Sequence, residues 1–203
     1  MCIRDRYLTT KKFKSAEAHE LRLAFEEVTG EDLNWYWNQW YYGSGHPIFD
    51  ISYQYDDMKK AALVVISQTQ KTGKIFRIPL AIDVYEGGNK TRHKVWVENE
   101  NDSFYFPYSR KPELINVDGD KIVLCQKTDH KTLENFIYQY SHAGLYLDRR
   151  EAIEFCAEHQ DDPAAQALLR QAVKDRYAEL RICLLYTSPS PRDRTRSRMP
   201  SSA

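Results

Sequence analysis

The sequence carries the first half of a zinc-binding motif but not the second half. His19-Glu20 begins an HExxH motif, in which two imidazoles one helical turn apart bind zinc and the glutamate acts as general base. Leu23 stands where the second histidine is required. The sequence also lacks a P-loop, a glycine-rich dinucleotide motif after a strand, a GxSxG motif and a paired CxxC motif. We therefore predict no catalytic, cofactor-binding or metal-ligating residue in this chain.

Two other groups of residues could contact a metal ion, and for each we favour a simpler interpretation. Cys156 and His159 lie three residues apart on a predicted helix, and His142 is the nearest third candidate. A buried cysteine and surface histidines are the commoner arrangement. The Asp-Gly-Asp stretch at 118–120 resembles the start of a calcium loop but lacks the later ligands and the closing glutamate. A hairpin turn is expected there instead.

Apolar residues at helical spacing predict two short helices within residues 7–46. Ser15 is the expected N-cap of the first helix, and Gly30 is the residue expected to end it. Glu31 and Asp32 suit the positive N-terminal end of the second helix. The apolar faces consist of Leu21, Ala24, Phe25 and Val28 in the first helix and Leu33, Tyr36, Trp37 and Trp40 in the second.

Residues 47–126 alternate between apolar and polar side chains, which is the period of β-strands with one buried face. About seven short strands separated by turns are typical of an antiparallel β-sandwich. The alternation is clearest in the first strand, where Phe49, Ile51, Tyr53 and Tyr55 share one face. We expect strands around residues 48–55, 61–68, 76–84, 91–97, 104–106, 114–117 and 122–124.

Residues 127–182 return to the helical period and predict antiparallel helices that begin a repeat-like helical domain. Asp148 with Glu151 suggests a capping box at the start of one helix, and Asp162 followed by Pro163 marks the start of the next. The fold class is therefore an α+β multidomain fragment. We expect a short helical segment, then an antiparallel β-sandwich, then antiparallel α-helices.

Both ends of the chain resemble translated sequencing-adapter sequence. Residues 183–203 match one adapter in frame, and residues 1–6 match the opposite adapter end. We expect both stretches to be artefacts, with residues 183–203 disordered, and exclude them from the fold. The genuine segment then covers residues 7–182 and is cut from a longer gene at both ends.

Charge and composition argue against two classes of partner. The formal net charge is zero, and the adapter-like ends carry +3 and +1, which leaves −4 for residues 7–182. That segment has no basic surplus to bind nucleic acid, and none of its apolar runs approaches the length of a membrane span. Cys125 and Cys156 are its two cysteines, too few for a disulfide framework. The compartment is not indicated.

Residues 25–47 contain three consecutive strings, FEEVTGEDL, WYWNQW and GSGHP. Further on, residues 76–80 read FRIPL, residues 114–118 read LINVD and residues 148–152 read DRREA. Together these strings resemble the aminopeptidase N family of zinc metallopeptidases. The first group is fairly specific, and the resemblance covers nearly all of residues 7–181.

The resemblance implies a domain order. Residues 7–46 would close a thermolysin-like catalytic domain, residues 47–126 would form the β-sandwich domain, and residues 127–182 would begin the helical domain. It also implies zinc as the cofactor of the parent enzyme and peptides as its substrates, with the zinc ligands and other catalytic residues all upstream of this chain. The side chains expected to pack against the missing catalytic domain are Trp35, Trp37, Trp40 and Tyr41.

We therefore expect a non-catalytic C-terminal fragment of a zinc-dependent aminopeptidase, an enzyme that removes N-terminal amino acids from peptides. The fragment is expected to be inactive alone and to bind no zinc. The alternative is a stand-alone β-sandwich module for binding or assembly, without enzyme activity. The upstream coding sequence separates the two, because only the first hypothesis requires an HExxH motif there.

Overall fold

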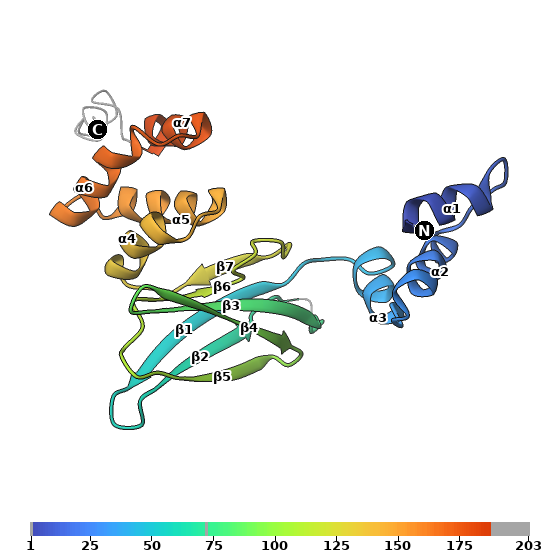
Figure 1. Ribbon diagram of the computed structural model, residues 1–203, viewed down its shortest axis with the longest axis horizontal. Coiled ribbons are helices and arrows are strands. Elements are labelled where there is room, and N and C mark those ends of the chain that lie inside the picture. The colour runs from blue at the N-terminus through green and yellow to red at the C-terminus, as the bar shows by residue number, and fades with distance from the viewer. Residues whose placement is uncertain (1, 72, 188–203) are drawn as a thin grey trace, which may run out of the picture. The chain divides into compact units, whose positions relative to one another are not determined.

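The computed structural model describes residues 2–71 and 73–187 and divides the chain between His46 and Pro47 into two units (Figure 1). The first unit is helical. The second contains two β-sheets followed by helices. The α+β fold class predicted from the sequence is confirmed.

The helices of the first unit are set by local signals. Gly30 is left-handed (φ 75°) and its N–H bonds to the Glu26 carbonyl, which ends the helix Ala18–Thr29, the first of the two predicted helices, as predicted. The predicted cap at Ser15 is wrong, because Glu17 and Glu20 form a reciprocal capping box two residues later. The elements are α1 (Ile3–Lys11), α2 (Ala18–Thr29), α3 (Asn34–Tyr36) and the π-helix η1 (Trp37–Tyr41).

The second predicted helix of this unit is a short α3 that widens into η1. The N–H of Tyr42 bonds to the Trp37 carbonyl at 2.9 Å, which is the i→i+5 pattern of a π-turn. Trp37 is 5% exposed, with its ring 5.7 Å from that of Phe25 and 6.2 Å from that of Tyr41 between centroids. Trp37 therefore belongs to the core of this unit, whereas Tyr41 is exposed.

The second unit begins with a two-sheet sandwich whose first strands alternate as predicted. Phe49 and Ile51 on β1, and Val64 and Ile66 on β2, are at most 1% exposed because one face of each strand points into the core. Within the described residues, one sheet has the order β5-β2-β1-β7 and the other β4-β3-β6. The strands are β1 (Ile48–Asp56), β2 (Ala61–Gln68), β3 (Ile78–Glu86), β4 (Asn89–Val97), β5 (Asn101–Pro107), β6 (Leu114–Val117) and β7 (Gln126–Asp129).

The prediction of the last strand is wrong in both place and direction. Ile122 and Leu124 are exposed and form no strand; the chain instead crosses to the other sheet and forms β7. Strand β7 pairs in parallel with β1, with Ile48 opposite Gln126, whereas the other strand pairs of the described residues are antiparallel. The strand was missed because its four residues are all polar and carry no apolar alternation.

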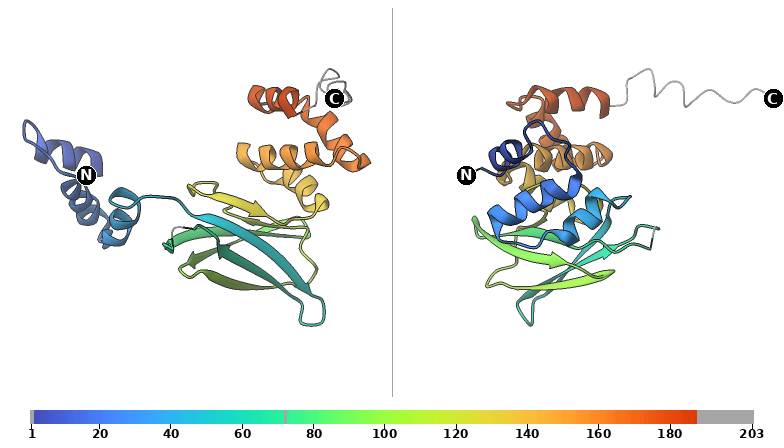
Figure 2. Two further views of the ribbon diagram at one scale, coloured as in Figure 1. Left: turned by 180° about the vertical axis from the view of Figure 1, so that it is seen from behind. Right: turned by 90° about the vertical axis from the view of Figure 1, so that its right-hand side faces the viewer.

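Helices α4 to α7 stack on the side of the sandwich where β7 lies (Figure 2). Their shared apolar core includes Phe136, Ile153, Cys156, Leu168 and Leu180. Short helices such as these are stabilised mainly by packing against their neighbours. The bounds are α4 (Leu133–His142), α5 (Tyr146–Glu158), α6 (Pro163–Ala172) and α7 (Ala178–Thr187).

The two predicted helix starts in this region have different outcomes. Asp162 caps α6 through its side chain and Pro163 is the first helical residue, so that prediction is confirmed. The capping box predicted at Asp148 is wrong, because α5 begins at Tyr146. Asp148 is buried in its first turn and accepts a hydrogen bond from Asn116 at 2.9 Å.

The adapter-like ends are partly helical. Helix α1 includes residues 3–6, and helix α7 extends through residues 183–187, which the sequence analysis expected to be disordered. For residues 183–187 that expectation is wrong. The rest of the stretch, residues 188–203, lies outside the described residues.

Candidate functional site

A buried charge cluster joins the sandwich to helix α5. Its members come from the loop after β6, from β7 and the residues that follow it, and from the first turns of α5. Charged side chains are rarely this deeply buried unless they are paired, and this cluster contains equal numbers of cations and anions. The members are Lys121, Lys127, Lys131, Asp129, Asp148 and Glu151.

Glu151 lies at the centre of one half of the cluster. Its carboxylate is 3.0 Å from Lys121 Nζ and 2.8 Å from Lys127 Nζ, and it accepts a hydrogen bond from Gln139 at 3.0 Å. Burial alone would raise the pKa of Glu151, but Lys127 and Lys121 outweigh it and lower that pKa to about 2. Lys121 also lies 3.2 Å from Asp148, so its ammonium group is held between two carboxylates.

Lys131 lies in the other half, with its side chain 1% exposed. Its Nζ is 2.9 Å from Asp129 and donates to Gln139 at 2.8 Å and to Asn116 at 3.2 Å. Burial lowers the pKa of Lys131 to about 8 in spite of the carboxylate. The Tyr53 hydroxyl donates to Asp129 at 2.8 Å, so β1, β7 and α4 all contact one buried ion pair.

This cluster is suited to holding elements together. Its two most buried lysines are at most 4% exposed, so a substrate cannot reach their ammonium groups. The hydrogen bonds instead connect β6, α4 and α5 through Asn116, Gln139 and Asp148. Breaking such a network is costly because it leaves buried charges without partners. We interpret the cluster as the link that fixes the helices on the sandwich.

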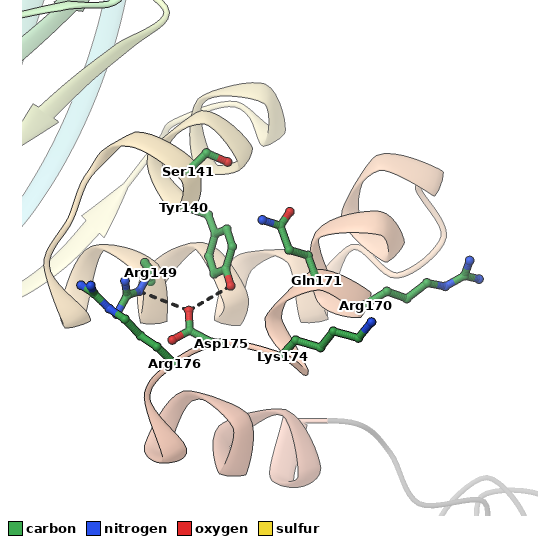
Figure 3. Close-up of a pocket in the computed structure, with 8 residues that line it drawn as sticks. All are labelled: Tyr140, Ser141, Arg149, Arg170, Gln171, Lys174, Asp175 and Arg176. Carbon is green, nitrogen blue, oxygen red and sulfur yellow. Dashed lines mark hydrogen bonds and ion pairs between the residues drawn. The ribbon is translucent and has the colours of Figure 1, made fainter.

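A second candidate site is a hollow of about 730 Å³ between the ends of helices α4 to α6 and the start of the loop before α7 (Figure 3). Arg149, Arg170, Lys174 and Arg176 line it, with Asp175 as the single carboxylate. The Tyr140 hydroxyl, which also lines the hollow, donates to Asp175 at 3.0 Å. Burial and the adjoining carboxylate raise the pKa of Tyr140 to about 12, so this hydroxyl is a hydrogen-bond donor at neutral pH.

The structure does not bring the metal-ligand candidates together. Cys156 is buried in the helical core, whereas the rings of His159 and His142 stack on Phe155 and Tyr138 one helical turn earlier. Each histidine ring also contacts a carbonyl of its own helix. Among the described residues, no group of three or more His, Cys, Asp or Glu side chains could hold a metal ion.

The turn at residues 118–120 is fixed by protein contacts. Asp83, at 1% exposure, accepts from Arg92 at 2.6 and 2.8 Å, and Arg92 also pairs with Asp120. Gly119 lies so close that a Cβ there would be 2.4 Å from Asp83 Oδ2. Asp118 accepts from the N–H groups of residues 122 and 123, so its carboxylate closes a turn and does not open a calcium loop. The predicted hairpin is wrong, because residues 122–124 form no strand and β6 pairs with β3 instead.

Sequence reasoning missed both candidate sites. Lys127, Asp129 and Lys131 alternate with period two, a pattern that indicates one strand face, but three charged residues indicate solvent far more often than a core. Their burial is tolerable because partners on other elements pair with them, such as Glu151 with Lys127 and Gln139 with Lys131. Three cations of the hollow, Arg170, Lys174 and Arg176, lie within seven residues of one another, but such a run usually indicates a solvated surface, and only the fold brings Arg149 beside them.

Comparisons with known proteins support the fold. No family model and no curated protein matches the chain. Among solved structures, the chain is similar to Legionella pneumophila aminopeptidase A, solved in complex with aspartic acid, with a TM-score of 0.71 at 15% sequence identity. The match covers 93% of this chain and 24% of that one, so the chain spans about a quarter of the aminopeptidase. At this identity the likeness shows an aminopeptidase-like fold.

None of the helices in residues 2–71 and 73–187 is both long enough and apolar enough to cross a membrane.

Proposed function

We propose that this chain is a non-catalytic part of a zinc-dependent aminopeptidase of the aminopeptidase N family. The observation that carries the proposal is the structural match, which extends over 93% of the chain and lies within an aminopeptidase. The strings in residues 25–47 support it independently, because they were assigned to the same family from the sequence alone. The parent enzyme would remove N-terminal amino acids from peptides.

The residues that the structure describes do not fit a zinc site. His19, the one histidine followed by glutamate, is exposed, and its ring lies 3.3 Å from Glu17. The described residues contain no group of potential ligands for a metal. Zinc in the parent would therefore depend on residues outside this chain, and the catalytic step is not assigned to any residue here.

The role we assign to the chain is structural. The buried charge cluster would hold the helices in a fixed position on the sandwich, and the first unit would pack against the missing remainder of the catalytic domain. Trp35, Trp40 and Tyr41 are proposed as docking residues, since Trp37 is already buried against Phe25. Trp35 and Trp40 are half-buried, whereas Tyr36, Tyr41 and Tyr42 are exposed and provide most of the accessible aromatic surface.

Two measurements test this proposal. The purified 203-residue chain should not hydrolyse aminoacyl-p-nitroanilides, with or without added zinc. Chelator-sensitive hydrolysis would contradict the non-catalytic assignment. The upstream coding sequence should encode HExxH and a later glutamate on a second helix. An unrelated upstream domain would contradict the aminopeptidase assignment and favour an independent sandwich module.

The state of the chain in solution separates the same alternatives. Exposed aromatic residues, with Tyr41 and Tyr42 both 58% exposed, should make the isolated chain self-associate if they normally dock on a missing domain. Tyr41→Ser/Tyr42→Ser should reduce that association. A wild-type chain that stays monomeric at high concentration would favour the independent module.

A further inference from the structure

The hollow lined by the four cations, hereafter the basic hollow, is not used by the proposed function. Of its eight lining residues, four are cationic, and Asp175 is the one that is anionic (Figure 3). Asp175 is already engaged, since it accepts from Tyr140 and lies 3.3 Å from Arg149 Nε. The hollow therefore has a local charge of +3 that these residues do not neutralise.

Arg149 is the buried part of this site. Its side chain is 10% exposed, and its Nε and Nη2 atoms are buried without a hydrogen-bond partner in the described structure. The Nε–Asp175 contact is close enough for charge attraction but does not have hydrogen-bond geometry. A buried guanidinium with unsatisfied donors is unfavourable, and an anion in the adjoining hollow would reduce that cost.

Tyr177 brings a second guanidinium beside the first. The Arg149 and Arg176 guanidinium carbons lie 5.0 and 5.2 Å from the centroid of its ring. Cation–π contact with one ring restrains two like charges in one region. Arg170 and Lys174 project from α6 and the residues after it on the other side of the hollow (Figure 3).

We propose that the basic hollow binds a phosphate-class oxyanion, either free or as the phosphate monoester of a small molecule. A dianion matches the local charge of +3 better than a monocarboxylate does, and guanidinium groups form paired hydrogen bonds with tetrahedral oxyanions. The hollow is open to solvent, so the organic part of a phosphate ester can extend out of it while the phosphate contacts the cations. This inference does not depend on the aminopeptidase assignment.

The test is calorimetric titration of the 203-residue chain at constant ionic strength with inorganic phosphate, glycerol 2-phosphate or acetate. Phosphate should bind at least about tenfold more tightly than acetate, since charge-assisted hydrogen bonds are worth about 1.5–3 kcal/mol each. Tighter binding of inorganic phosphate would identify a free ion as the ligand, and tighter binding of glycerol 2-phosphate would identify an ester. Equal affinity for phosphate and acetate, or no binding of either phosphate, would overturn the proposal.

Variants locate the binding in the hollow. Arg170→Gln/Lys174→Gln alters only exposed cations and should weaken phosphate binding at least about tenfold without changing the circular dichroism spectrum. Arg150→Gln is the matched control, because Arg150 is the neighbour of Arg149 but pairs with Glu154 outside the hollow. Equal weakening in the control, or unchanged affinity in the double variant, would show that phosphate binds elsewhere and overturn the proposal.

Discussion

Replacing Glu151 by glutamine removes one negative charge from the buried charge cluster and keeps the shape of the side chain. Lys121 and Lys127 would then share a smaller compensating charge. The lowering of the Glu151 pKa from 4.5 to about 2 corresponds to about 3 kcal/mol of folding free energy at pH 7. We expect Glu151→Gln to lower the free energy of unfolding by about that amount.

The pH dependence of this effect has a definite sign. The pKa of Glu151 is lower in the folded state than in the unfolded state. The stabilisation is therefore present above pH 4.5 and is lost as the pH falls through about 2. The gap between wild type and variant should therefore narrow from about 3 kcal/mol at pH 7 to about 1.5 kcal/mol at pH 3. Urea unfolding followed by far-ultraviolet circular dichroism over this pH range measures the gap.

Glu154→Gln is the matched control for this prediction. Glu154 lies one helical turn further along α5, has a side chain that is 45% exposed and pairs with Arg150 on the surface. Replacing Glu154 by glutamine should change the free energy of unfolding by no more than about 0.5 kcal/mol, because exposed ion pairs contribute little to stability. A Glu151→Gln effect as small as the control, or a gap that does not narrow on acidification, would refute the assignment of Glu151 as the stabilising anion of the cluster.

Two further predictions concern the sandwich and its junction with the helices. Burial lowers the pKa of Lys131 from 10.5 to about 8. Between pH 8 and pH 10.5 the unfolded state therefore binds more protons than the folded state, and the free energy of unfolding of the wild type should rise by about 2.5 kcal/mol from pH 7 to pH 10. Lys131→Met should lack this rise. If urea unfolding shows the same increase between pH 7 and pH 10 in the wild type and in the variant, the prediction is wrong. Gly119→Ala places a Cβ 2.4 Å from Asp83 Oδ2, whose carboxylate is fixed by Arg92, and should destabilise by about 1–3 kcal/mol. Thermal unfolding compares it with Gly144→Ala, which meets nothing within 4 Å; equal shifts in both variants would show that Asp83 moves freely.

The sequence determined the features that depend on a few neighbouring residues. Gly30 ends α2 because glycine adopts a left-handed conformation without strain, and Asp162-Pro163 starts α6 because both residues suit the first turn. The alternation of Phe49 and Ile51 fixed the buried face of β1 in the same way. The charges at 127–131 alternate with period two, but charged residues indicated a solvated face and not a buried one.

Tertiary structure alone decided the rest. Strand β7 is polar and exists because it pairs with β1, about 78 residues earlier, and Asp148 became a buried partner of Lys121 although its spacing indicated a cap. Burial of Lys131 is acceptable only where Asp129, Gln139 and Asn116 surround its ammonium group. Charges interact through space and their burial costs free energy that only particular partners offset, so no local pattern of residues specifies such a site.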